Sequence, residues 1–132
     1  MPALDTNVLV RFLVGDDPDQ YDIAKHYIHT IVPPDTLFIS LPVALELEWV
    51  LRSRYQRDKG TILNVFNGLL ESREIEFQEE ATIERALSLY TEHAADFADC
   101  MHLAVAMTHE RPPLVTFDRK AARMQGTELL RG

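Results

Sequence analysis

Apolar residues recur in two patterns along this chain, and their alternation predicts its secondary structure. Short runs rich in branched and aromatic residues, such as 36–39 and 114–117, are typical of buried strands. Between the runs, apolar residues return every three or four positions, the period of an amphipathic helix. The predicted strands are residues 2–4, 36–39, 75–77, 114–117 and 128–130. The predicted helices are residues 6–13, 21–31, 41–57, 62–71, 81–93, 97–108 and 118–124.

Breaking and capping residues mark where these helices begin and end. Residues 15–18 and the proline pairs at 33–34 and 112–113 interrupt the helical pattern, because proline lacks an N–H donor and clashes with the preceding turn. Ser40 and Asp96 each precede an apolar segment, where a side-chain oxygen can accept from free backbone N–H groups. The strand–helix order predicts an α/β fold with a parallel sheet covered by helices on both faces.

Length and composition place these elements in one domain. The chain has 132 residues, 46% of them hydrophobic, which is enough for a single buried core, so we expect one domain over residues 1–132. No window approaches the roughly 18 to 20 apolar residues of a membrane span, and we expect a cytoplasmic protein without membrane association. The lone Cys100 excludes an internal disulfide or a cysteine-cluster zinc site, and we expect it to pack in the core.

Charge argues against binding nucleic acid through bulk electrostatics. The formal net charge is −8, with a sequence pI near 5.0, whereas proteins that hold nucleic acid by charge are usually basic. Two local basic groups stand out, at residues 52–59 and 119–123. Any contact with a phosphodiester must therefore be local.

Four acidic residues fall where a predicted strand has ended or a helix has begun: Asp5, Glu46, Asp99 and Asp118. The carboxyl ends of parallel strands face one crevice. Four carboxylates gathered there repel one another unless a divalent cation lies between them. The pattern therefore predicts a metal site.

Each acid also has an ordinary structural interpretation. Asp5, Asp99 and Asp118 lie near helix starts, where a carboxylate stabilises the helix by about 0.5 to 2 kcal/mol. Asp96 already offers a cap for its helix, so a second acid one turn later, at Asp99, is partly redundant. For these residues a capping role remains open.

Glu46 and Glu48 are predicted to differ in burial. Glu46 falls within the apolar stripe of Val43, Leu47 and Val50, where an unpaired charge is costly and a metal would compensate it. Glu48 points to the other side of the helix, where Arg52 can pair with it at (i, i+4), so we expect Glu48 at the surface.

Several apolar positions and one histidine have alternative interpretations. The wide apolar arc of residues 62–70 favours contact with another chain over core packing, and Tyr27, Ile28 and Ile31 form a second candidate surface, for which core packing is an equal alternative. His102 lies one turn beyond Asp99. We expect it to pack in its helix, since hard Mg²⁺ prefers oxygen ligands.

Four segments in order resemble the PIN domain, and within it the VapC-type toxins of toxin–antitoxin operons. They are Leu4-Asp5-Thr6-Asn7-Val8-Leu9, Ala44-Leu45-Glu46-Leu47-Glu48-Trp49-Val50-Leu51, Asp96-Phe97-Ala98-Asp99 with His102-Leu103-Ala104, and Val115-Thr116-Phe117-Asp118-Arg119. Each motif alone is weak, but four in sequence over nearly the whole chain are specific. The fold implied is a PIN-like three-layer α/β/α sandwich with a central, mainly parallel sheet of four to five strands.

The resemblance implies a Mg²⁺- or Mn²⁺-dependent endoribonuclease that leaves a 3′-hydroxyl and a 5′-phosphate. By this resemblance, the metal ligands and catalytic residues are Asp5, Glu46, Asp99 and Asp118. The supporting residues are Thr6, Asn7, Asp96 and Thr116. Arg119, Lys120 and Arg52 are candidates for positioning phosphates. The implied partners are RNA, a VapB-like antitoxin and a second copy of the chain in a homodimer.

Other classes of protein fit less well. An aspartate-nucleophile phosphohydrolase needs a second aspartate where this chain has Asn7. No Gly-x-Ser-x-Gly elbow and no glycine-rich phosphate loop occur, so neither a serine hydrolase nor a nucleotide cofactor is indicated. A housekeeping PIN nuclease in RNA processing and a catalytically idle PIN-like binding module remain as alternatives.

Overall fold

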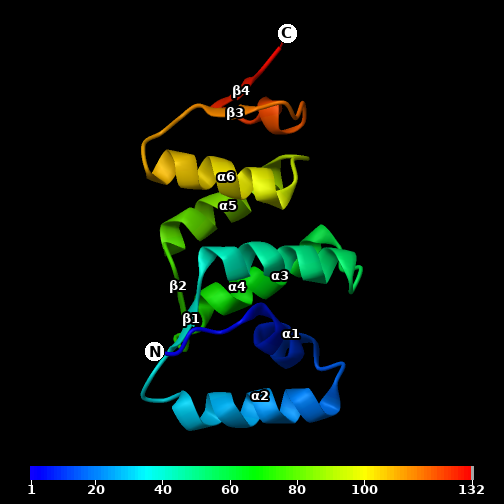
Figure 1. The fold of residues 1–132 in the computed structure, drawn as a ribbon, viewed down its shortest axis with the longest axis vertical. Helices are drawn as coiled ribbons and strands as arrows, with labels where there is room; N and C mark the ends of the chain where they lie inside the picture. Colours follow the sequence, from blue (N-terminus) through cyan, green and yellow to red (C-terminus); the bar gives the residue numbers. More distant parts are fainter. Residues whose placement is uncertain (132) are drawn as a thin grey trace. The chain divides into compact units, whose positions relative to one another are not determined.

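A computed structural model describes residues 1–131 and shows two compact units, Met1–Gln78 and the segment from Glu79 onward. Figure 1 labels the helices and strands of both. The first unit contains α1 (Thr6–Val14), α2 (Pro18–Ile31), β1 (Leu37–Ile39), α3 (Leu41–Ser53), α4 (Lys59–Glu71) and β2 (Ile75–Phe77). The second contains α5 (Glu80–Glu92), α6 (Phe97–Thr108), β3 (Leu114–Thr116), the 3-10 helix η1 (Ala121–Arg123) and β4 (Thr127–Leu129).

The first unit is built around a parallel strand pair. β1 and β2 align with Leu37 opposite Ile75. Ala3 forms a further parallel bridge to Phe38, with Leu4 N donating to Phe38 O at 3.0 Å. The segment before α1 therefore runs beside β1, and α1 begins directly where that pairing stops.

Local chemistry sets the helix limits in this unit. The side chains of Asp17, Ser40 and Asp58 accept backbone hydrogen bonds at the starts of α2, α3 and α4. Gly15 ends α1 in the left-handed conformation, with φ of 70°, which costs a glycine little. α3 ends at Ser53, four residues before the predicted end at 57. Just beyond it Gln56 has a φ of 52°, which no helix can contain.

The second unit consists of a helix pair and a small sheet. α5 packs against α6, and the Tyr90 and Phe97 rings meet edge to face with centroids 5.0 Å apart. Across the same pair, Thr82 Oγ1 donates to Thr108 Oγ1 at 2.8 Å. β3 and β4 are parallel, with Leu114 opposite Thr127. Cys100 is buried in α6, as expected.

The predicted α/β class with parallel strands is confirmed. Within residues 1–131 there are four strands of three residues each, arranged as one parallel pair in each unit. β1 and β3 are one residue shorter than the predicted strands 36–39 and 114–117, because only these residues make ladder hydrogen bonds. β2 has the predicted bounds, β4 begins one residue before the predicted strand 128–130, and the predicted strand 2–4 is reduced to the bridge at Ala3. No helix among the described residues is long and apolar enough to cross a membrane.

The expected burial of the two glutamates of α3 is wrong. Glu48 has a side chain only 3% exposed, and its Oε2 accepts from Arg52 Nε at 2.8 Å, while Glu46 is exposed. The buried face of α3 includes Ala44 and Leu51 as well as Leu47. It is therefore wider than the predicted stripe, and at about 100° per residue Glu48 falls inside it whereas Glu46 falls at its border.

We predict that Arg52→Met destabilises the protein by about 1 to 3 kcal/mol, because it takes a charge-assisted partner from a buried carboxylate. Chemical denaturation at neutral pH measures the change. Arg57→Met is the matched control, since Arg57 is exposed in the same segment and forms no ion pair within the described part of the chain. Equal effects of the two substitutions would contradict a stabilising Glu48–Arg52 pair.

Candidate metal centre

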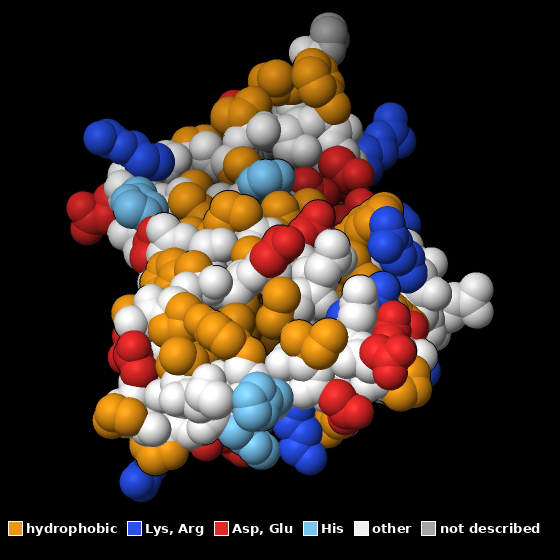
Figure 2. Space-filling view, turned by 60° about the horizontal axis from the view of Figure 1, so that its bottom comes forward, with side chains coloured by type: hydrophobic (Ala, Val, Ile, Leu, Met, Phe, Trp, Pro, Cys, Tyr) orange, Lys and Arg blue, Asp and Glu red, His pale blue; other side chains and the backbone are white. Residues whose placement is uncertain are grey.

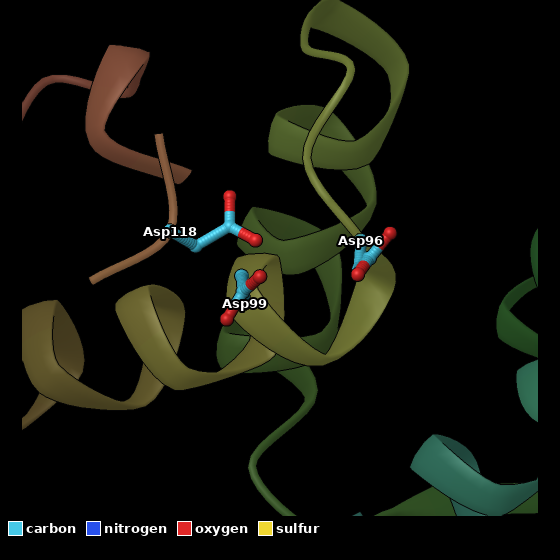
Figure 3. Close-up of side chains that lie close together, drawn as sticks. All are labelled: Asp96, Asp99 and Asp118. Atoms are coloured by element: carbon cyan, nitrogen blue, oxygen red, sulfur yellow. The ribbon is translucent and has the colours of Figure 1, made fainter. Parts of the chain in front are cut away.

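Three carboxylates of the second unit converge on one point. One oxygen each from Asp96, Asp99 and Asp118 lie within 4.8 Å of one another. Figure 3 shows Asp96 at the start of α6, Asp99 in its first turn, and Asp118 reaching toward Asp99 from the loop that follows β3. Segments distant in sequence thus bring like charges together.

The start of α6 leaves both of its acids available for a ligand. Asp96 occupies the N-cap position with extended backbone, and its carbonyl accepts from Cys100 N at 3.1 Å. Its carboxylate makes no capping hydrogen bond, although that is its expected structural role. The helix therefore begins without engaging the Asp96 side chain, which joins Asp99 in the cluster.

The turn after β3 holds Asp118 in place. Thr116 Oγ1 accepts from Asp118 N at 2.9 Å, and Asp118 Oδ1 accepts from Ala121 N at 2.9 Å. These bonds tie Asp118 to the strand before it and to η1 after it. The second carboxylate oxygen of Asp118 makes no hydrogen bond to the described residues and remains available to a cation.

Electrostatics within the cluster are unfavourable without a cation. Partial burial raises the pKa of Asp99 above its ordinary value, the charges of Asp118 and Asp96 raise it further, and His102 lowers it. None of the three acids forms an ion pair with a Lys or Arg among residues 1–131. An all-oxygen donor set with uncompensated negative charge fits a hard divalent cation such as Mg²⁺, Mn²⁺ or Ca²⁺.

Two further predicted ligands, Asp5 and Glu46, belong to the first unit. Asp5 follows the segment paired with β1, and its Oδ1 accepts from Thr6 N at 2.8 Å, so it also has a local structural role. Glu46 is exposed on α3, which packs against α1. Thr6 is only 2% exposed, and its Oγ1 makes no hydrogen bond within the described residues. A buried polar atom is thus left unsatisfied beside Asp5.

The remaining predicted residues lie on the surface. Asn7, Arg119 and Lys120 are exposed. Arg119 lines a groove of about 1020 Å³ in the second unit. Its lining also includes Arg123, from the same basic group of residues 119–123, and Arg131, which the pattern of charges in the sequence gives no reason to place there. Arg52, proposed for phosphate contact, is already paired with Glu48.

His102 does not pack inside its helix as expected, because its position on α6 faces away from the buried side formed by Met101, Leu103 and Ala104. It is exposed instead.

On the face drawn in Figure 2, basic side chains stand in separate groups among acidic and apolar ones, consistent with local rather than overall positive charge.

Comparison with known proteins agrees with the resemblance of the four motifs. The profile of the PIN domain matches residues 3–126. The VapC ribonuclease of Aquifex aeolicus (strain VF5) is 25% identical over 124 residues, which cover 94% of this chain and 92% of that protein. A solved toxin–antitoxin complex from Klebsiella pneumoniae aligns with a TM-score of 0.37 and 23% identity, over 97% of this chain and 96% of that one.

With a match over most of its length, the chain belongs to the PIN domain family. Within that family it is similar to a VapC ribonuclease along nearly its whole sequence. The carboxylate cluster of α6 and the β3 turn lies inside the matched residues.

We predict that Asp99→Asn raises the melting temperature of metal-free protein at pH values above the raised pKa of Asp99 in the folded state. The folded pKa of Asp99 lies above the unfolded value near 3.8, so between the two pKa values the folded state keeps a proton that the unfolded state has lost. The free energy of unfolding of the wild type therefore falls as pH rises through this window. The Asp99→Asn variant has an uncharged amide at this position and should not show this loss of stability. Calorimetry from pH 4 to 8 in chelator measures the effect.

The same experiment with metal provides the counterpart. Millimolar Mg²⁺ should raise the melting temperature of the wild type and leave Asp99→Asn nearly unchanged. Asp22→Asn, an exposed acid of α2, is the control and should respond like the wild type. Identical pH profiles of wild type and Asp99→Asn would argue that the three acids do not interact.

Proposed function

We propose that the protein is a metal-dependent endoribonuclease of the VapC type that hydrolyses RNA phosphodiester bonds. The observation that carries the proposal is the cluster of Asp96, Asp99 and Asp118, in which three carboxylates lie together without a compensating cation in the described chain. The similarity to a VapC ribonuclease supports RNA as the substrate.

The proposed ligands are Asp5, Glu46, Asp99 and Asp118, with Asp96 beside Asp99 and Asp118. We take the two compact units as parts of one PIN domain, since the family profile spans both. A bound Mg²⁺ or Mn²⁺ supplies positive charge to the phosphate and makes water more acidic. Asp96, the carboxylate that neither caps nor pairs, is suited to orient the attacking water and accept its proton.

Supporting residues act through the ligands. Thr116 fixes the backbone of Asp118 through its hydroxyl. Thr6 offers a buried hydroxyl beside Asp5 that can hold a water or a ligand oxygen. The exposed guanidinium of Arg119 and the ammonium of Lys120, which follow Asp118 directly, are positioned to contact phosphates without reading bases.

We predict that purified protein cleaves RNA only when Mg²⁺ or Mn²⁺ is added, and that Asp5→Ala or Asp99→Asn lowers the rate at least about 100-fold, because each removes a ligand oxygen. Gel analysis of a labelled RNA measures the cleavage, with Glu84→Gln, an exposed acid of α5, as the control. Cleavage unchanged in both site variants would refute the assignment. RNA binding without cleavage would favour the idle binding module.

An apolar groove in the first unit supports an antitoxin as partner. It has a volume of about 360 Å³ and is lined by residues of α1, α2, α4 and the strand pair. The lining includes Phe12, Leu13, Ile28, Val65 and Gly68. An amphipathic helix binds such a groove through its apolar face, and the similarity to a VapC ribonuclease favours an antitoxin over an RNA-processing partner.

We predict that Gly68→Leu abolishes inhibition by a co-expressed antitoxin while RNA cleavage is retained. A Cβ at Gly68 meets nothing within 4 Å, so the substitution fits the fold and adds about 0.5 to 1 kcal/mol of helix propensity, but its side chain fills the groove. Cleavage assays with and without the antitoxin give the result, and Asn67→Leu, one residue away and exposed, is the control.

Normal inhibition of Gly68→Leu would place the antitoxin elsewhere. Sedimentation of the wild type and of Gly68→Leu tests the homodimer implied by the resemblance. A monomeric variant with a dimeric wild type would assign the groove to the second copy instead.

A further inference from the structure

The only tryptophan of the chain lies at the surface, although such a large aromatic side chain is usually mostly buried. Trp49 is 49% exposed on α3. Its position is on the side of the helix opposite Leu47 and Leu51, which are buried. About half of Trp49 is therefore exposed and available to a ligand.

A basic side chain lies near the indole, and an acidic residue shares its side of α3. The guanidinium carbon of Arg54 lies 6.0 Å from the centre of the Trp49 ring, a distance at which a cation is attracted to the face of the ring. Glu46, a proposed metal ligand, lies three residues before Trp49. On an α-helix this places Glu46 about 60° around the axis and about 4.5 Å along it, on the same exposed side.

Positive charge is concentrated just past the end of this helix. Arg54 and Arg57 are exposed and form no ion pair within the described residues. In a chain with a net charge of −8 this is a local exception. An aromatic ring beside the Arg54 guanidinium matches a nucleotide, which offers a base to stack and a phosphate to pair.

We propose that Trp49 stacks on an unpaired base of single-stranded RNA, while Arg54 and Arg57 contact the adjacent phosphates. This inference rests on the proposed function, because it takes RNA as the substrate held near Glu46. A protein partner is a poorer match, since the Arg54 guanidinium beside the ring would require an acidic surface opposite. Stacking accepts any base, so the contact selects single strands over duplexes without reading sequence.

Because the chain has one tryptophan, its fluorescence reports on this side chain alone. The experiment titrates a single-stranded RNA oligonucleotide into Asp99→Asn protein, which avoids cleavage. Saturable quenching of the fluorescence is expected with the normal oligonucleotide, and much weaker quenching with an abasic or a duplex oligonucleotide of equal charge. Equal quenching by all three would overturn the proposal, because it would reflect phosphate contact alone.

Binding of labelled RNA, measured by anisotropy in the same background, supplies a second test. Trp49→Ala should weaken binding about 10-fold, and Trp49→Phe should retain most of it, since a phenyl ring also stacks. Ile23→Ala is the control, as Ile23 is an apolar residue of α2 that is 70% exposed. Its binding should equal that of Asp99→Asn alone, and melting temperatures verify that each variant folds.

The outcomes separate this inference from the proposed function. If the wild type cleaves RNA but Trp49→Ala binds RNA as well as its parent, the stacking proposal is wrong and the nuclease proposal stands. If single-stranded RNA quenches the fluorescence but the wild type does not cleave RNA in Mg²⁺, the stacking proposal stands and the nuclease proposal is wrong. A fluorescence change that depends on protein concentration and not on RNA would assign Trp49 to a contact between two copies, and would overturn the proposal.

Discussion

Repulsion among the carboxylates of Asp96, Asp99 and Asp118 is the constraint on which the candidate site depends. Three like charges within 4.8 Å raise the free energy of the folded state. The helix start and the turn that hold them are stabilised by other groups, including the Asp96 carbonyl and the Thr116 hydroxyl. The fold can therefore keep the acids together although they oppose it, and a cation is the natural compensation.

Helices were largely predictable because their signals are local. Periodic apolar residues and side-chain caps, such as Ser40 and Asp58, act within one or two turns. The end of α3 was missed because Gln56 is an ordinary residue with no pattern that indicates a positive φ. Strand positions were found from their apolar runs, but their lengths depend on pairing across the chain, which no local pattern contains.

The candidate site was predictable in part, and its errors have physical causes. Asp99 and Asp118 are predicted together with Asp96 as a supporting acid, and the structure brings these three into one cluster. The capping role that the sequence also predicts for Asp96 is absent, because its side chain makes no capping hydrogen bond. Glu46 and Glu48 exchanged their expected environments because the buried face of α3 is wider than the stripe that three residues define. A helical pattern locates a face to within about one residue, which is too coarse to separate two acids two positions apart.

The unsatisfied hydroxyl of Thr6 has a consequence for how the molecule responds to its ligand. The chain itself supplies no hydrogen-bond partner to this buried Oγ1 within the described residues. Any molecule that supplies the missing acceptor or donor gains this hydrogen bond in addition to its own contacts. The N-terminal turn of α1 should then be most rigid when loaded, so that order in this segment reports on occupancy.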